Sequence, residues 1–218
     1  DYPIARFGRL IFEGTVPKDA AAETAAIAPA AAQVGYVSLA GTKPAQPSDA
    51  AKAAMGGEKG VFIVGQRDLG KIMWMELRGI RKFAIGRLAG AGARSRRAVL
   101  GISRVNAVGE PPFDAVVVDG IAPGDGARVV PADYGAEVVH PSAAVIPAPG
   151  PAPRQRLLLD VTESLRKDVA AGRTTSAYRL RISGGCTRTD GKIRYQIFGG
   201  VRDGKPDETP VLRVTLAP

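Results

Sequence analysis

The sequence predicts an all-β fold built from antiparallel strands, with one short helix. Short runs rich in β-branched and aromatic residues recur along the chain, bounded by Gly, Pro and Asp. The last third alternates apolar and polar residues at period two, which is typical of strands with one face in a core. Only one segment carries the spacing and end signals of a helix.

Residues 1–60 are predicted to form an irregular N-terminal region. The alanine-rich segments 18–33 and 45–55 are broken by prolines and show no apolar stripe. We therefore expect loops with a helical turn or two in both segments. Strands are expected in this region at residues 9–12 and 34–39.

The core of the sandwich is predicted to occupy residues 61–218, so that 1–218 is a single domain. Asp190-Gly191 and Asp203-Gly204 are turn signals that separate the last three strands. Because links of this kind are too short for a parallel crossover, those strands are expected to pair antiparallel. Strands are expected at residues 61–64, 72–77, 80–85, 98–102, 115–118, 178–182, 193–197 and 212–216.

One helix is expected at about residues 161–171. Asp160 is a favourable N-cap, and Glu163 follows three residues later, as in a capping box. The proline-rich stretch 141–153 before it excludes helix and central strand, which leaves an extended crossing between sheets or a linker. Because strands are expected on both sides of it, a crossing within one domain is preferred. An apolar stripe repeats every four residues of the helix, at Val161, Leu165 and Val169.

Charge is unevenly distributed along this basic chain, whose net charge is +9. Residues 67–104 carry 10 basic and 2 acidic groups, whereas residues 105–153 carry 1 basic and 6 acidic groups. A basic field attracts polyanions such as nucleic acid, acidic polysaccharide or an anionic envelope. The same bias also fits a merely solvated, arginine-rich surface, so both interpretations stay open.

Three segments resemble the secreted jelly-roll modules of the DNRLRE type, which are similar to a family of carbohydrate-binding modules. Residues 81–85 followed by 95–100 resemble the arginine-rich strand, loop and next strand of that family. Residues 157–165 resemble its hydrophobic-Asp-Val-Thr entry into a short helix, and residues 210–215 its closing strand. The usual Asp after the Phe of the first motif is Ala84 here. The resemblance implies an extracellular or cell-surface antiparallel jelly-roll β-sandwich, with some relatives that bind acidic glycans.

The candidate ligand-binding site surrounds the single tryptophan, in the most basic segment. A flat aromatic face with cations beside it suits an acidic sugar. Trp74 is equally compatible with a core position, because apolar residues flank it. The predicted ligand-binding residues are Trp74, Arg67, Lys71, Arg78 and Arg81.

A structural calcium is the one cofactor that the sequence offers, and none is required for the expected function. Asp114, Asp119 and Asp125 lie in the acidic, glycine-containing segment and are its candidate oxygen ligands, without an EF-hand spacing. The chain has one histidine and one cysteine, too few for a zinc site. A Cys186–His140 pair is conceivable, but a loop histidine and a semi-buried thiol explain these residues as well.

The expected function is therefore that of a non-catalytic extracellular module that binds a polysaccharide, in particular an acidic one. The alternative is a structural subunit of a bacterial surface layer, fibre or capsid-like assembly, in which copies of the chain self-associate. Nucleic acid is not expected as a partner, because no recognition helix is apparent and aromatic residues are few. Membrane insertion is not expected either, since no stretch approaches 20 apolar residues.

Overall fold

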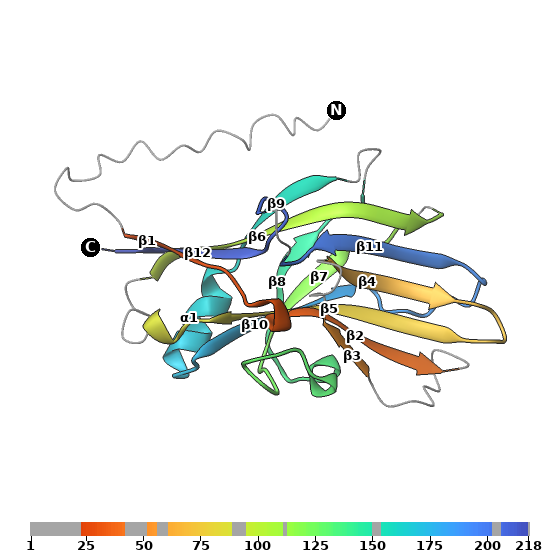
Figure 1. Ribbon diagram of the computed structural model, residues 1–218, viewed down its shortest axis with the longest axis horizontal. Coiled ribbons are helices and arrows are strands. Elements are labelled where there is room, and N and C mark those ends of the chain that lie inside the picture. The colour runs from red at the N-terminus through yellow and green to blue at the C-terminus, as the bar shows by residue number, and fades with distance from the viewer. Residues whose placement is uncertain are drawn as a thin grey trace.

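The computed structural model describes residues 23–41, 52–55, 61–88, 95–110, 113–149, 154–201 and 206–217. Figure 1 shows strands throughout, with one α-helix, α1 (Thr162–Ala170), beside β10 at one end of the described part. Short 3-10 helices are η2 (Ala31–Gln33), η3 (Gly86–Leu88) and η5 (Pro131–Tyr134). The strands are β1 (Thr24–Ile27), β2 (Val34–Gly41), β3 (Lys52–Met55), β4 (Val61–Asp68), β5 (Trp74–Ala84), β6 (Ser95–Gly109), β7 (Val116–Ile121), β8 (Val138–Ile146), β9 (Gln155–Asp160), β10 (Thr175–Ile182), β11 (Ile193–Gly199) and β12 (Val211–Leu216).

All these strands belong to one curled antiparallel sheet, in the order β1-β12-β6-β11-β4-β5-β10-β7-β8. Off this path, β9 pairs with β6, and β2 pairs with both β5 and β3. The prediction of an all-β, antiparallel sandwich with a single helix is confirmed. No helix in the described residues is long and apolar enough to span a membrane.

Two long strands make the sheet curl around its core. The first part of β5 pairs with β4 and its second part with β10, and β6 passes in the same way from β12 to β11. Gly79 lies at the change of partner in β5, where Phe62 occupies the space that a side chain would need. On its other side, β5 pairs with β2 without interruption across this glycine. Residues 72–77 and 80–85, expected as two strands, therefore form one.

The main core lies inside this curl and is made of aliphatic and aromatic side chains from both halves of the sheet. Phe62 stacks on Phe198 with ring centroids 5.1 Å apart, and Phe83 meets Tyr178 edge to face at 6.1 Å. Leu165 of α1 is fully buried in the same cluster, which confirms the predicted apolar stripe of the helix. Burial of such side chains is the main favourable term in the stability of the fold.

The expected pairing among the last three strands is wrong. β10 pairs with β5 and β7, β11 with β4 and β6, and β12 with β1 and β6. More residues separate these strands than a tight hairpin turn needs, so neighbours in sequence are free to pair with other strands. Burial of each apolar face therefore selects partners that are distant in sequence.

Several segments that were not expected as strands are strands. β1 and β3 come from the alanine-rich segments. β9, directly before the helix, was not expected as a strand either. Alanine has low strand propensity, so pairing with β12 and β2 decides these two strands. β8 includes Pro141 and ends the strand path, where a proline is tolerated. The strand expected at 9–12 lies outside the described residues.

The helix begins close to its expected start but without the expected capping box. Its N-cap is Val161, and the Asp160 carboxylate accepts hydrogen bonds from the Thr162 backbone N–H at 3.0 Å and hydroxyl at 2.6 Å. Glu163 instead forms an ion pair with Arg166 at 2.6 Å. The carboxylate of Asp160 thus still anchors the entry to the helix, from one residue further back.

Candidate anion-binding groove

The predicted ligand-binding residues do not form one exposed platform. Trp74 is 3% exposed and belongs to the main core, so it cannot serve as a surface for a sugar ring. Arg81 is fully buried, with its guanidinium carbon 3.7 Å above the Phe62 ring. Arg67 and Lys71 are exposed. The prediction of a binding platform around Trp74 is therefore wrong, because pairing in β5 turns this face into the core.

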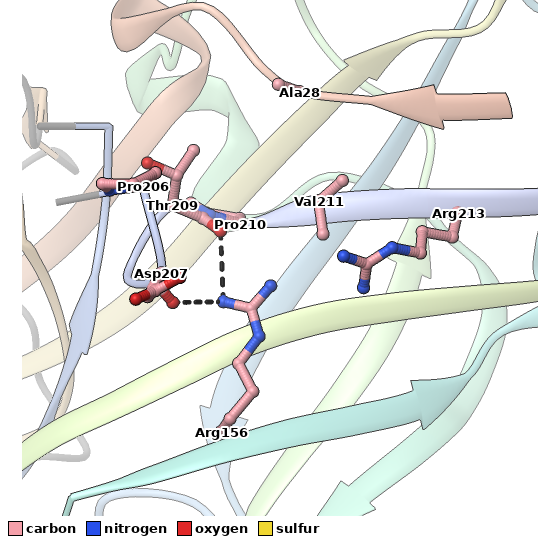
Figure 2. A pocket seen from close by; sticks show the side chains of 8 residues that line it. All are labelled: Ala28, Arg156, Pro206, Asp207, Thr209, Pro210, Val211 and Arg213. Atoms are coloured by element: carbon pink, nitrogen blue, oxygen red, sulfur yellow. Dashed lines mark hydrogen bonds between the residues drawn. The ribbon is translucent and has the colours of Figure 1, made fainter.

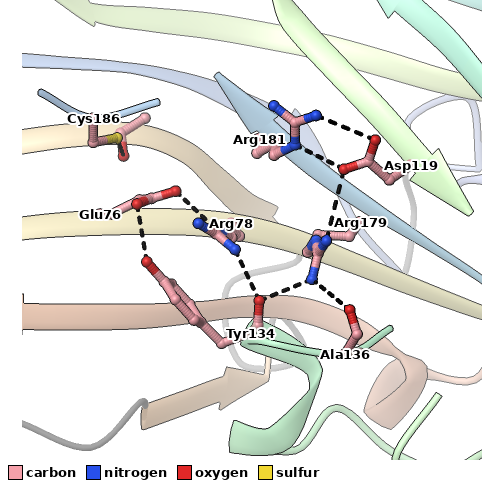
Figure 3. Close-up of polar contacts among 9 residues, drawn as sticks. Glu76, Arg78, Asp119, Tyr134, Ala136, Arg179, Arg181 and Cys186 are labelled. Carbon is pink, nitrogen blue, oxygen red and sulfur yellow. Dashed lines mark hydrogen bonds and ion pairs between the residues drawn. The ribbon is translucent and has the colours of Figure 1, made fainter. Parts of the chain in front are cut away.

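Arg78 belongs to a network that holds residues 122–137 against the sheet (Figure 3). Its guanidinium lies 3.9 Å from the Tyr134 ring centre, forms an ion pair with Glu76 at 2.6 Å and donates to the Tyr134 carbonyl at 2.9 Å. Arg179 donates to the same carbonyl at 2.9 Å. The Tyr134 hydroxyl donates to Glu76 at 2.9 Å. Arg78 therefore has a structural role that the sequence did not indicate.

The three candidate calcium ligands do not converge. Asp119 is fully buried and its carboxylate accepts from Arg181 at 2.7 Å, with Arg179 at 3.7 Å. Asp114 pairs with Arg188 at 2.8 Å, and Asp125 with Arg128 at 3.4 Å. The described residues contain no group of three or more acidic, His or Cys side chains suited to a metal. The prediction of a calcium site at these residues is wrong, because each carboxylate forms an ion pair with an arginine and the three do not meet.

Cys186 and His140 lie in different surroundings. Burial raises the pKa of the Cys186 thiol, which opposes thiolate formation, and its sulfur lies 3.5 Å from the Gly65 carbonyl oxygen. His140 is on β8 beside Gly120. The fold thus provides no activated thiol at Cys186.

A cleft of about 540 Å³ opens beside β12 and β9, at the turn of residues 206–210 (Figure 2). Two arginines from distant parts of the sequence, Arg156 of β9 and Arg213 of β12, point their guanidinium groups toward each other across it. Partial burial, and then the charge of Arg213, lower the pKa of Arg156, against the opposing charge of Asp207. The described residues that line the cleft are Ala28, Arg156, Pro206, Asp207, Thr209, Pro210, Val211 and Arg213.

Arg156 is held in one orientation. One terminal nitrogen donates to the Ser103 hydroxyl at 2.9 Å and to the carbonyl oxygens of Asp207 and Thr209 at 2.8 and 3.2 Å. Its other terminal nitrogen lies over Gly101, where a Cβ atom would approach it to 2.8 Å. The glycine thus makes room for the guanidinium. Three contacts on one nitrogen leave the remaining donors of Arg156 for a ligand.

Arg213 forms no hydrogen bond or ion pair with the residues that the structure describes, and it is exposed. Its neighbours on the strands that flank β12 are Ala26 and Val99, neither of which is charged. The two guanidinium groups therefore face one another, and Asp207 is the one acidic residue in the described lining of this cleft. Such a pair of cations, one of them pre-oriented, is suited to a planar carboxylate or a sulfate.

A second cleft, of about 320 Å³, adjoins the first and shares Arg156, Pro206 and Asp207 with it. Arg154 lines this second cleft and lies 3.5 Å from the Glu208 carboxylate. We call the two clefts together the arginine groove. None of its described lining residues is aromatic.

Sequence reasoning missed this groove. The alternation in 212–216 correctly placed Arg213 outside the core, but nothing in the sequence links it to Arg156. β6 joins them, since it pairs with β12 on one side and β9 on the other.

The sequence matches no family model, and a search of curated proteins finds no significantly similar sequence. The functional argument therefore depends on the chemistry of the arginine groove.

Proposed function

We propose that this chain is a non-catalytic module that binds an acidic polysaccharide outside the cell or at its surface, through the arginine groove. The observation that carries the proposal is the approach of Arg156 and Arg213 across an open cleft, whose described lining holds these two cations and one acidic residue, Asp207. Their donors suit carboxylate or sulfate oxygens. Pro206, Pro210 and Val211 provide apolar walls for the C–H faces of a sugar ring.

The test is binding of polygalacturonate, alginate and heparin by isothermal titration, with neutral dextran as the comparison. Arg156→Gln together with Arg213→Gln should weaken binding of an acidic polymer about 100-fold, because two charge-assisted contacts are lost. Binding of the unchanged protein should also weaken as salt is added. No measurable binding of any acidic polysaccharide by the unchanged protein would refute the proposal.

Two control variants remove the same amount of charge elsewhere. Arg96→Gln with Lys167→Gln changes two exposed cations that lie outside the groove, and should alter affinity less than about threefold. Arg67→Gln with Lys71→Gln tests the exposed cations of the site first predicted from sequence. If the Arg67→Gln, Lys71→Gln variant lost as much affinity as the Arg156→Gln, Arg213→Gln variant, overall charge rather than the groove would determine binding.

A second function, assembly of copies into a layer, fibre or shell, is favoured by the edge strand β8. Among the described strands it pairs with β7 alone, and Val145 on it is 56% exposed. An unpaired edge with apolar side chains is a template for another strand. Size-exclusion chromatography with light scattering over a wide range of dilutions tests this: concentration-dependent oligomers support assembly, and a monomer at every concentration rejects it.

A further inference from the structure

The two clefts of the arginine groove share one wall. Arg156, Pro206 and Asp207 line both, whereas Arg213 lines only the first and Arg154 only the second. The groove therefore presents three cations in succession, Arg213, Arg156 and Arg154, together with the two acidic residues Asp207 and Glu208. The antiparallel arrangement of β12, β6 and β9 sets the positions of Arg213 and Arg156, and Arg154 comes directly before β9.

The cations differ in how firmly they are held. Arg156 is fixed by its contacts to Ser103, Asp207 and Thr209. The side chain of Arg154 is 71% exposed, and it pairs with the Glu208 carboxylate at 3.5 Å, a distance typical of a weak surface pair. An acidic group of a ligand can compete for such a cation at low cost. The middle of the groove is thus rigid and both ends are open to an arriving anion.

Each cleft is within the size range of pockets that hold a small ligand, so the groove exceeds what one sugar needs. We propose that the arginine groove binds an internal stretch of a polyuronate or sulfated glycan, with at least two acidic sugars of one chain engaged together. This inference rests on the proposed function and adds that the ligand is recognised as a polymer. A single acidic sugar would leave one cation-bearing cleft empty.

Nucleic acid is the other common polyanion, and the lining of the groove disfavours it. Proteins that bind single-stranded nucleic acid combine cations with aromatic side chains on which bases stack. The described lining residues supply proline and valine instead. Oligothymidylate with a matched number of charges therefore serves as a competing probe in the test below.

The experiment is calorimetric titration of galacturonic acid and of its dimer, tetramer and hexamer. We expect affinity to rise about tenfold or more from monomer to tetramer, because the second acidic group binds at a high effective concentration. Arg154→Gln should reduce the ratio of tetramer to monomer affinity about threefold or more, whereas Arg96→Gln should leave this ratio unchanged.

Three outcomes separate the inference from the proposed function. Affinity independent of chain length would overturn the inference while binding of acidic sugars itself survived. No binding of any acidic oligomer or polymer would overturn the proposed function. Oligothymidylate binding as tight as that of the hexamer would overturn recognition of a glycan in favour of a general polyanion groove.

Discussion

Arg81 has a fully buried guanidinium group in an apolar surrounding. None of its three side-chain nitrogens has a hydrogen-bond partner among the described residues, and its close contact is the Phe62 ring. Burial, and then the charge of Arg156, lower the pKa of Arg81 well below its ordinary value. A desolvated cation over a ring contributes about 2 kcal/mol or more, whereas removing the ion from water costs several kcal/mol. The buried charge of Arg81 therefore destabilises the folded state.

Arg81→Met is expected to raise the free energy of unfolding by about 1 kcal/mol or more, because it removes the buried charge and keeps a linear side chain. Urea denaturation followed by tryptophan fluorescence measures the change. Arg81→Lys, which keeps a charge, is the control and should not stabilise the fold. A loss of more than about 1 kcal/mol in Arg81→Met would contradict the prediction and reveal a partner for the guanidinium.

Asp119 is the opposite case, a buried carboxylate that has hydrogen-bond and ion-pair partners. Although burial alone would raise its pKa, hydrogen bonds from Arg181 and from the Ser142 backbone N–H, with the charges of Arg181 and Arg179, lower it overall. Ser142 has a φ of 49°, so the carboxylate also holds β8 in an uncommon backbone conformation. Because the pKa is depressed in the folded state, this stabilisation exists above the unfolded pKa and disappears as pH falls through the folded one.

Asp119→Asn is expected to lower the free energy of unfolding by about 3 kcal/mol at neutral pH, since two arginines lose their carboxylate. The difference from the unchanged protein should shrink as pH is lowered below about 4. Denaturation at a series of pH values measures it. Asp125→Asn, in a more exposed pair, is the control and should cost less than about 1 kcal/mol. A difference that does not vary with pH would contradict the assignment.

At the scale of elements, residues 122–137 form a cover over the second apolar cluster of the sheet, which contains Val37, Ile80 and Ile121. Its main anchor is Lys82, whose ammonium lies 2.8 Å from the Asp133 carboxylate, with both side chains fully buried. The same ammonium donates to the carbonyl oxygens of Asp125 and Arg128. A buried pair with every donor satisfied couples this segment firmly to β5.

Asp133→Asn should destabilise the protein by about 3 to 5 kcal/mol, because the Lys82 charge stays buried without its partner. Hydrogen exchange of the Val129 amide, which donates to the Ala32 carbonyl at 2.9 Å, should accelerate as the cover opens. The double variant Lys82→Met with Asp133→Asn removes the unpaired charge and should recover much of the loss. No recovery in the double variant would show that the Asp133 bonds to Gly124 and Val130 dominate instead.

Elements with strong local patterns could be predicted, and those selected by partners could not. Residues 34–39, 61–64 and 193–197 have β-branched and aromatic side chains, and each is a strand. β1 and β3 are alanine-rich and become strands only through their neighbours. Gly79 looked like a break between strands, but it allows Phe62 to pack while β5 continues. Local propensity is a weak guide wherever tertiary pairing supplies the larger free energy.

At the scale of the whole molecule, charge that is dispersed in sequence becomes local in space. The basic segment 67–104 suggested a binding site there. Arg81 is instead buried in the interior, and Arg78 and Lys82 bind the cover formed by residues 122–137. The groove instead draws Arg156 and Arg213 from the C-terminal third. Cations near one another in sequence alternate across a strand. Arg156 and Arg213 instead come together because β6 pairs with both of their strands, β9 and β12.

By itself, the sequence determined the all-β class, the position of the helix and the sheet face on which each residue of 178–182 and 212–216 lies, although Arg179, expected to face water, is buried. These follow from the periodicity of apolar residues, which is a local property. Only the tertiary structure decided which strands are neighbours, that Trp74 is buried, and that Arg156 meets Arg213 across a cleft. The reason is that strand pairing is non-local: the partners of a strand are chosen by burial over the whole sheet.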